Sequence, residues 1–478
     1  MQRIGEHRRF LVHPGRNTRG PRAEYTVSPN AGPAAHLPAM YSPGSLRRFE
    51  RKTFGKGAMA PWTFFAVSLF GALLTLNAYV AQRRTGPLVI PSFLLGWLVG
   101  ELPLHTLGLQ LIGTVVFVAN GALASAPGLW GLGLSLLSWV ALGLLVSQAR
   151  KAAPILEASL VAGLGEDYRS EITAELNDSL DRVSPPPGLA LNPFRLNRPE
   201  VIRHSDIPYV PGGGKRNQLD VYAPRAGTEN APVLLQIHGG GWTIGNKHEQ
   251  ALPLMNFMAA QGWVCVAANY RLSPKNTFPD HLVDAKRAIA WIRREIAHYG
   301  GNPDFIAVTG GSAGGHLSAM VGLTANDPEY QPGFEDVDTR VQAAVPFYGV
   351  YDFSNHFDLQ PADTLRSWVG KSVLKRNPET EMAEFKRASP AHRLHAEAPP
   401  FFVIHGTNDS LACIEEARHF AQSLARVSNN PVAYGELPGT QHAFEVFHSI
   451  RASAAVVAAG RFLTWSLSRE LQKSAEGD

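Results

Sequence analysis

The stretch Gly310-Gly311-Ser312-Ala313-Gly314-Gly315 lies between an apolar run at 305–309 and a helix-like stretch at 316–323. A serine on a sharp turn from a strand into a helix adopts a strained backbone, so small residues are needed two positions to either side. Gly310 and Gly314 occupy those positions around Ser312. The stretch therefore predicts a nucleophile elbow, with Ser312 as the nucleophile.

A glycine loop follows the apolar run at 233–237, well upstream of the elbow, and reads His-Gly-Gly-Gly-Trp over 238–242. Successive glycines let backbone NH groups approach a ligand where side chains would collide. Alone, the loop is more simply a tight turn, but beside an elbow it predicts an oxyanion hole. The expected donors are the NH groups of Gly239, Gly240 and Ala313, although Gly241 could replace one of them. His238 is expected to hold the loop by hydrogen bonding, without transferring a proton.

An acid and a base follow the elbow along the chain. Asp409 comes directly after the apolar run at 401–405, and His442 lies in a loop after the strand-like run at 432–437. In an open α/β sheet, ligands bind where the carboxyl ends of the strands meet. Ser312, Asp409 and His442 therefore form a candidate triad, in the chain order of nucleophile, acid and histidine.

Other titratable residues compete for these roles. His405 lies on a predicted strand and His316 just after the elbow, so packing or support of the site explains both better. Asp304, Asp327 and Asp352 lie in loops, where turn or capping roles suffice.

Four motifs together resemble the bacterial hormone-sensitive-lipase-like esterases of the α/β-hydrolase superfamily. The resemblance covers roughly residues 200–470 and departs from the family at two positions, Gly311 and Lys275, where members usually carry an acidic residue. The elbow sequence is also similar to that of acetyl and feruloyl esterases and of prenylcysteine methylesterase-like enzymes. The motifs are the glycine loop at 238–242, Asn269–Pro274 with Phe278–Asp280, the elbow at 310–315, and His405–Asp409.

The fold expected for residues 201–475 is an α/β-hydrolase catalytic domain. Strand-like runs alternate with amphipathic helices in its later part, which favours a mainly parallel, eight-stranded sheet covered by helices on both faces. The expected strands are 201–210, 217–223, 232–238, 263–270, 305–311, 341–348, 401–407 and 432–437.

Two long stretches upstream lack Lys, Arg, Asp and Glu: 26 residues at 57–82 and 48 residues at 102–149. A bilayer requires about 20 apolar residues per spanning helix. Residues 59–150 are therefore predicted to be an all-α, multi-pass transmembrane region of the cell membrane, with spans near 60–81, 104–123 and 128–148. The segment 87–100 is a fourth short span, a re-entrant segment, or an interfacial helix with Trp97 among the headgroups.

Residues 1–58 carry 11 Lys and Arg against three Glu and predict a basic, disordered tail. This tail accounts for the whole chain's net charge of +4, so nucleic-acid binding has no support. Arg47, Arg48, Arg51 and Lys52 precede the first span and predict a cytoplasmic N-terminus. Three spans would place the catalytic domain outside the cytoplasm, and four would keep it inside.

Residues 151–200 connect the membrane region to the enzyme, either as cap helices over the acyl pocket or as a linker helix packed on the sheet. The insertion at 351–400 is a second candidate for pocket walls, with Trp368 and Phe385 as apolar lining. Cys265 and Cys413 are expected to be packed thiols. No metal-ligand spacing or cofactor motif stands in a convincing context, so neither a metal nor a cofactor is expected.

These observations predict a membrane-anchored serine carboxylesterase or lipase that hydrolyses small-molecule or lipid esters in contact with membrane lipids. One alternative is an acyltransferase or amidase with the same triad. Another is a non-catalytic binding protein on a hydrolase fold. Neither the acyl chain, nor the alcohol, nor the oligomeric state follows from the sequence.

Overall fold

The structure, a computed structural model, describes residues 56–80, 88–177, 192–359 and 364–477. The predicted tail lies outside these residues, except for its last three residues, which begin helix α1.

One sheet of eight strands carries the catalytic half, in the order β1-β2-β4-β3-β5-β6-β7-β8. β2 pairs antiparallel with both β1 and β4, and the neighbouring strands from β4 to β8 pair in parallel. The predicted mainly parallel, eight-stranded α/β-hydrolase sheet is confirmed. The strands are β1 (Val201–Pro208), β2 (Gln218–Pro224), β3 (Ala231–Ile237), β4 (Val264–Ala268), β5 (Gly301–Gly311), β6 (Ala343–Phe347), β7 (Phe401–Gly406) and β8 (Val432–Leu437).

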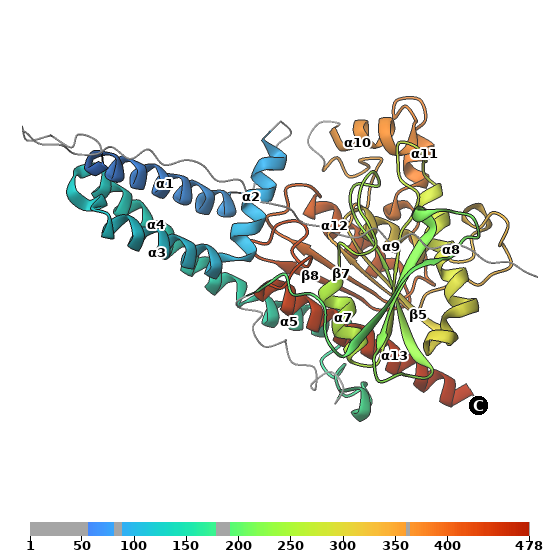
Figure 1. Cartoon of the computed structure of the whole chain (residues 1–478). Helices are drawn as coiled ribbons and strands as arrows, with labels where there is room; N and C mark the ends of the chain where they lie inside the picture. Colours follow the sequence, from blue (N-terminus) through green and yellow to red (C-terminus); the bar gives the residue numbers. More distant parts are fainter. Residues whose placement is uncertain (1–55, 81–87, 178–191, 360–363, 478) are drawn as a thin grey trace, which may run out of the picture. The chain divides into compact units, whose positions relative to one another are not determined.

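Helices cover both faces of the sheet (Figure 1). Successive strand side chains point to opposite faces, so Val233 and Leu235 enter one core cluster while Leu234 enters the other. The first cluster includes side chains of α8 (Asp280–Glu295), α9 (Ala313–Leu323) and α12 (Ile414–Val427). The second includes side chains of α5 (Ala152–Leu164), α7 (Leu252–Ala260) and α13 (Ile450–Gly477).

The linker helix α5 packs on the sheet. Leu156 and Leu160 are fully buried in the second cluster, and a Cβ added at Gly163 would come 2.6 Å from the Cα of Ala433 on β8. This contact fits the linker alternative for the segment 151–200 and places α5 away from a cap position.

The insertion between β6 and β7 contains two short helices, α10 (Thr364–Val369) and α11 (Met382–Arg387). Phe385 of α11 is fully buried in the first core cluster, so its expected role in lining the pocket is wrong. Trp368 of α10 is 37% exposed, and a Cβ added at Gly241 would come 3.0 Å from its ring. Trp368 therefore borders the glycine loop, as expected of a wall residue.

Four apolar helices precede α5: α1 (Lys56–Tyr79), α2 (Val89–Glu101), α3 (Pro103–Ala119) and α4 (Ala126–Ala149). Two helices, Met59–Tyr79 and the α4–α5 pair over Ala126–Leu164, are long and apolar enough to cross a membrane. The α2–α3 pair passes the same test only together and is bent by 90°. Helices α1, α3 and α4 thus coincide with the three predicted spans, while α2 is the ambiguous segment.

Small residues bring α1 and α4 into close contact. A Cβ added at Gly131 would come 3.1 Å from the Cα of Phe65, and hydroxyl pairs join Thr75 to Ser138 at 2.8 Å and Ser135 to Ser68 at 3.0 Å. Close packing of small residues, with hydroxyl bonds between helices, is typical of helix pairs in membranes.

Candidate active site

The elbow at Ser312 is strained, as its sequence predicts. Ser312 has φ 59° and ψ −120°, a conformation that costs energy for any residue with a side chain. A Cβ at Gly310 would lie 2.5 Å from the carbonyl oxygens of Gly314 and Ile237, and one at Gly314 would lie 2.0 Å from that of Ile237. Only glycine fits these two positions, because the neighbouring backbone leaves no room.

The glycine loop follows β3 and differs from the expectation at one donor. The NH of Gly239 donates to Oε1 of Gln250 at 2.6 Å, so it is already occupied. Within the described residues, no hydrogen bond engages the NH of Gly240 or of Gly241, whose φ values are +106° and +57°. Ala313 is the first residue of α9, where a backbone NH has no partner within the helix. Gly241 therefore replaces Gly239 beside Gly240 and Ala313 as a candidate donor.

His238 supports this loop. Its Nδ1 donates to the carbonyl of Gly239 at 2.7 Å, its ring stacks on Tyr270 at 4.3 Å, and the Tyr270 hydroxyl donates to its carbonyl at 3.0 Å. Burial lowers the pKa of His238 to about 4, so the ring is neutral near pH 7. The ring suits a role in holding the loop.

Asp409 and His442 meet at the carboxyl ends of β7 and β8. Oδ2 of Asp409 accepts a hydrogen bond from Nδ1 of His442 at 2.7 Å, and both residues are buried. Oδ1 of Asp409 accepts the NH groups of Leu411 and Ala412, each at 2.8 Å. Burial alone would raise the pKa of Asp409, but His442 and His405 together hold it well below its usual range. The carboxylate is therefore charged and fixed in place.

His405 approaches the same carboxylate from β7. Its Nε2 lies 3.1 Å from Oδ2 of Asp409 and 3.3 Å from the carbonyl of Ala412. The side chain is fully buried, in agreement with a supporting role.

The structure brings Ser312 to the same edge of the sheet without joining it to the imidazole. Within the described residues, no hydrogen bond links the Ser312 hydroxyl to His442. Tyr348, at the end of β6, lies beside both. Its ring centroid is 4.5 Å from that of His442, and a Cβ added at Gly311 would come 2.5 Å from its hydroxyl. Hydrogen bonds between catalytic groups are often long in unliganded enzymes and tighten with substrate.

Tyr348 and Glu445 were missed by sequence reasoning. The Tyr348 hydroxyl donates to Oε2 of Glu445, which is buried three residues after His442. Burial raises the pKa of Glu445 to about 7. Tyr348 fills the space beside Gly311. The sequence signal that could have indicated such a neighbour was Gly311 itself, because a residue without a side chain leaves space for the side chain of another element.

The competing residues have structural roles. Nε2 of His316 donates to the carbonyl of Ala388 at 2.8 Å, and burial lowers the His316 pKa to about 4. Asp327 accepts the NH of Glu329 at 3.1 Å within a turn. Asp352 likewise accepts the NH of Ser354 at 2.9 Å.

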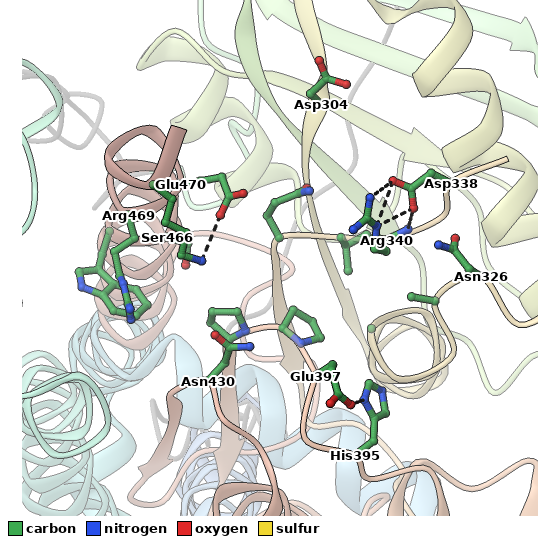
Figure 2. A pocket seen from close by; sticks show the side chains of 18 of the residues that line it. Asp304, Asn326, Asp338, Arg340, His395, Glu397, Asn430, Ser466, Arg469 and Glu470 are labelled. Atoms are coloured by element: carbon green, nitrogen blue, oxygen red, sulfur yellow. Dashed lines mark hydrogen bonds and ion pairs between the residues drawn. The ribbon is translucent and has the colours of Figure 1, made fainter. Parts of the chain in front are cut away.

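A polar cavity of about 610 Å³ lies elsewhere (Figure 2). It is lined by Asp304, Gln342 and Pro400, which lie where β5, β6 and β7 begin, so it opens at the sheet edge opposite Ser312. Charged groups that line it pair with one another, such as Arg340 with Asp338 at 2.9 Å. The cavity is therefore no part of the candidate active site.

The chain is similar in sequence to curated proteins that are named as ester hydrolases. A family model described as BD-FAE matches residues 219–424. The chain is 45% identical to LipM of Mycobacterium tuberculosis, a probable carboxylic ester hydrolase, over 83% of this chain and 91% of LipM. It is 44% identical to the esterase LipQ of the same species, over 66% of this chain and 75% of LipQ. A solved esterase from Thermogutta terrifontis is 26% identical, with a TM-score of 0.45 over 58% of this chain and 95% of that chain.

Proposed function

The chain belongs to the family of carboxylic ester hydrolases that includes LipM and LipQ of Mycobacterium tuberculosis, and we propose that it hydrolyses esters through an acyl-enzyme on Ser312. On its motifs we assign it to the hormone-sensitive-lipase-like branch of the α/β-hydrolase superfamily. The observation that carries the mechanism is the 2.7 Å bond between His442 and Asp409, at the sheet edge that also holds the Ser312 elbow.

In the first half-reaction, Oγ of Ser312 attacks the ester carbonyl and passes its proton to Nε2 of His442. Asp409 accepts the Nδ1 hydrogen bond, which fixes the tautomer and stabilises the imidazolium. His442 then protonates the leaving alcohol. In the second half-reaction, His442 takes a proton from water, which attacks the acyl-enzyme; the acyl carbon–Oγ bond then breaks, His442 returns the proton to Oγ of Ser312, and the carboxylic acid leaves.

The negative charge on the carbonyl oxygen develops beside the NH groups of Gly240, Gly241 and Ala313. The positive end of the α9 dipole lies at the same place and adds to the stabilisation. Loss of one such donor costs roughly 100- to 1000-fold in turnover, so the glycine loop matters nearly as much as the nucleophile.

We also propose that α1, α3 and α4 cross the cell membrane and anchor the enzyme there. The 13 residues of α2 are shorter than the about 20 that a crossing requires, and α2 turns away from α3 by 90°. The three-span alternative is therefore favoured, with the catalytic domain on the side of the membrane opposite the N-terminus.

The nucleophile is tested with a fluorophosphonate probe on the full-length protein in detergent. We expect the wild type and Ser474→Ala, a control on the exposed end of α13, to be labelled and to hydrolyse p-nitrophenyl acetate. Ser312→Ala is expected to lose both properties while it keeps its thermal stability. Labelling of Ser312→Ala at the wild-type rate would refute the assignment.

A further inference from the structure

The loop that carries His442 is covered by α2, a helix from the apolar N-terminal region. The ring centroid of Phe93 lies 6.1 Å from that of His442, and Nε1 of Trp97 donates to the carbonyl of Ala443 at 2.9 Å. The Trp97 ring also packs on Phe447 at 4.9 Å. The catalytic histidine thus has a wall supplied from outside the hydrolase fold.

A buried ion pair holds α2 in this place. Nη1 of Arg451, at the start of α13, donates to the carbonyl of Gly100 at 2.8 Å and lies 3.5 Å from Oε1 of Glu101. The Ser449 hydroxyl donates to Oε2 of the same glutamate at 2.7 Å. Arg451 and Glu101 are buried, and a buried charge is costly unless it stays paired. The end of α2 is therefore fixed to the loop region of the active site.

The outward side of α2 is apolar. Ile90, Leu94, Leu95 and Leu98 are between 40% and 56% exposed, and Glu101 at its end is the helix's single charged residue. An exposed apolar face of this kind, next to the apolar helix α3, suits contact with lipid acyl chains. Ile90 and Leu94 of this face lie on either side, in sequence, of Phe93, whose ring is beside His442.

Exposed apolar side chains also border the other catalytic loops. Ile244 follows the glycine loop and is 69% exposed, and Leu411 follows Asp409 and is 36% exposed. These two side chains add exposed apolar surface to the loops that carry the candidate site.

We propose that α2 forms one wall of the acyl-binding site and receives the hydrocarbon chain of a membrane-resident, long-chain ester directly from the bilayer. The inference rests on the proposed esterase mechanism at Ser312 and assigns its substrate class. Phe93 is the specificity-determining residue, because its ring lies between the apolar surface of α2 and the catalytic imidazole.

The test compares hydrolysis of p-nitrophenyl palmitate and p-nitrophenyl acetate by the full-length protein in lipid nanodiscs. For Phe93→Ala we expect kcat/KM for palmitate to fall by roughly tenfold or more relative to that for acetate. Phe93→Leu is expected to show a smaller selective loss for palmitate, because a shorter apolar side chain remains beside His442. The control Leu109→Ala removes an exposed apolar side chain of α3 and is expected to leave the ratio at the wild-type value.

Equal losses for both esters in Phe93→Ala would overturn the inference, since Phe93 would then only support His442. A wild type that hydrolyses acetate but not palmitate would also overturn it and would leave the esterase mechanism intact. Failure to hydrolyse either ester would contradict the mechanism itself. If Phe93→Ala has lost its fold and no longer reacts with a short fluorophosphonate, Phe93→Leu decides: a selective, smaller loss for palmitate supports the inference, and an unchanged ratio overturns it.

Discussion

Single residues around the catalytic histidine show how closely the site is packed. Tyr348 touches the imidazole of His442 and the space beside Gly311, and its hydroxyl is held by Glu445. Tyr348 and Glu445 come from other elements than the elbow, and together they fill the space beside Gly311. Tyr348 and Glu445 are therefore positioning residues, since they act on the reaction through His442.

Glu445 makes the stability of the folded protein depend on pH. Burial raises its pKa from 4.5 to about 7, so the folded state binds this proton more tightly than the unfolded state does. The stability that this proton contributes is fully present below about pH 4.5 and is lost as the pH rises through about 7, by an amount on the order of 3 kcal/mol. We expect Glu445→Gln to flatten the dependence of Tm on pH over that range. An unchanged slope in the variant would exclude Glu445 as its source.

The three candidate triad residues could be selected from the sequence because strand ends and the loops after them are encoded locally. Ser312, Asp409 and His442 each follow an apolar run that the structure confirms as a strand. The occupied NH of Gly239 was not predictable, because its partner Gln250 lies in a loop with no regular pattern. Spacing along the chain identifies a glycine loop but does not tell which of its NH groups remain free.

At the scale of elements, the most consequential contact is the one between α2 and the start of α13. The residues that meet there are far apart in the sequence: Ser449 and Glu101 are separated by 348 positions. Hydrophobic patterning alone left α2 with three interpretations, because a 13-residue apolar helix fits a short span, a re-entrant segment or an interfacial helix. The buried charges add what the pattern does not contain, since they fix one end of α2 to the catalytic domain.

We expect Arg451→Met to destabilise the protein by about 3–5 kcal/mol, because it leaves Glu101 as a buried charge without its partner. The matched control is Arg461→Met on the same helix, whose partner Glu157 is partly exposed, with an expected cost of about 1 kcal/mol or less. Denaturant unfolding in detergent measures both. Adding Glu101→Gln to Arg451→Met should recover much of the loss. Equal costs for the two arginine variants would show that the buried pair does not hold α2.

At the scale of the whole molecule, the sequence predicted both halves of the described chain, an apolar helical region and an α/β-hydrolase domain. It did not predict that α2 of the first half lies beside His442 of the second. Each half has its own hydrophobic pattern, whereas their contact depends on a few aromatic and charged side chains of α2 and α13. Such isolated contacts leave no periodic signal in a sequence.

The proposed three-span topology predicts that the catalytic domain and the N-terminal segment are labelled differently in intact cells. In a Cys413→Ser background, where Cys265 is buried, we expect a membrane-impermeant maleimide to label Glu229→Cys, in the exposed turn before β3. Ser45→Cys in the basic N-terminal segment is expected to be labelled only after lysis. Labelling of both positions only after lysis would instead indicate an even number of crossings and would contradict the three-span proposal.

The wall that α2 contributes has a practical consequence for anyone who studies the hydrolase domain as a soluble fragment. A truncated protein that begins near residue 192 would lack Phe93 and Trp97, and it would uncover the hydrophobic surface of β8 that α5 occupies. Its preference for short or long esters would then be that of a site without the α2 wall, and not that of the full-length protein. Substrate profiles of this enzyme are therefore meaningful only when the helices that precede the sheet are retained.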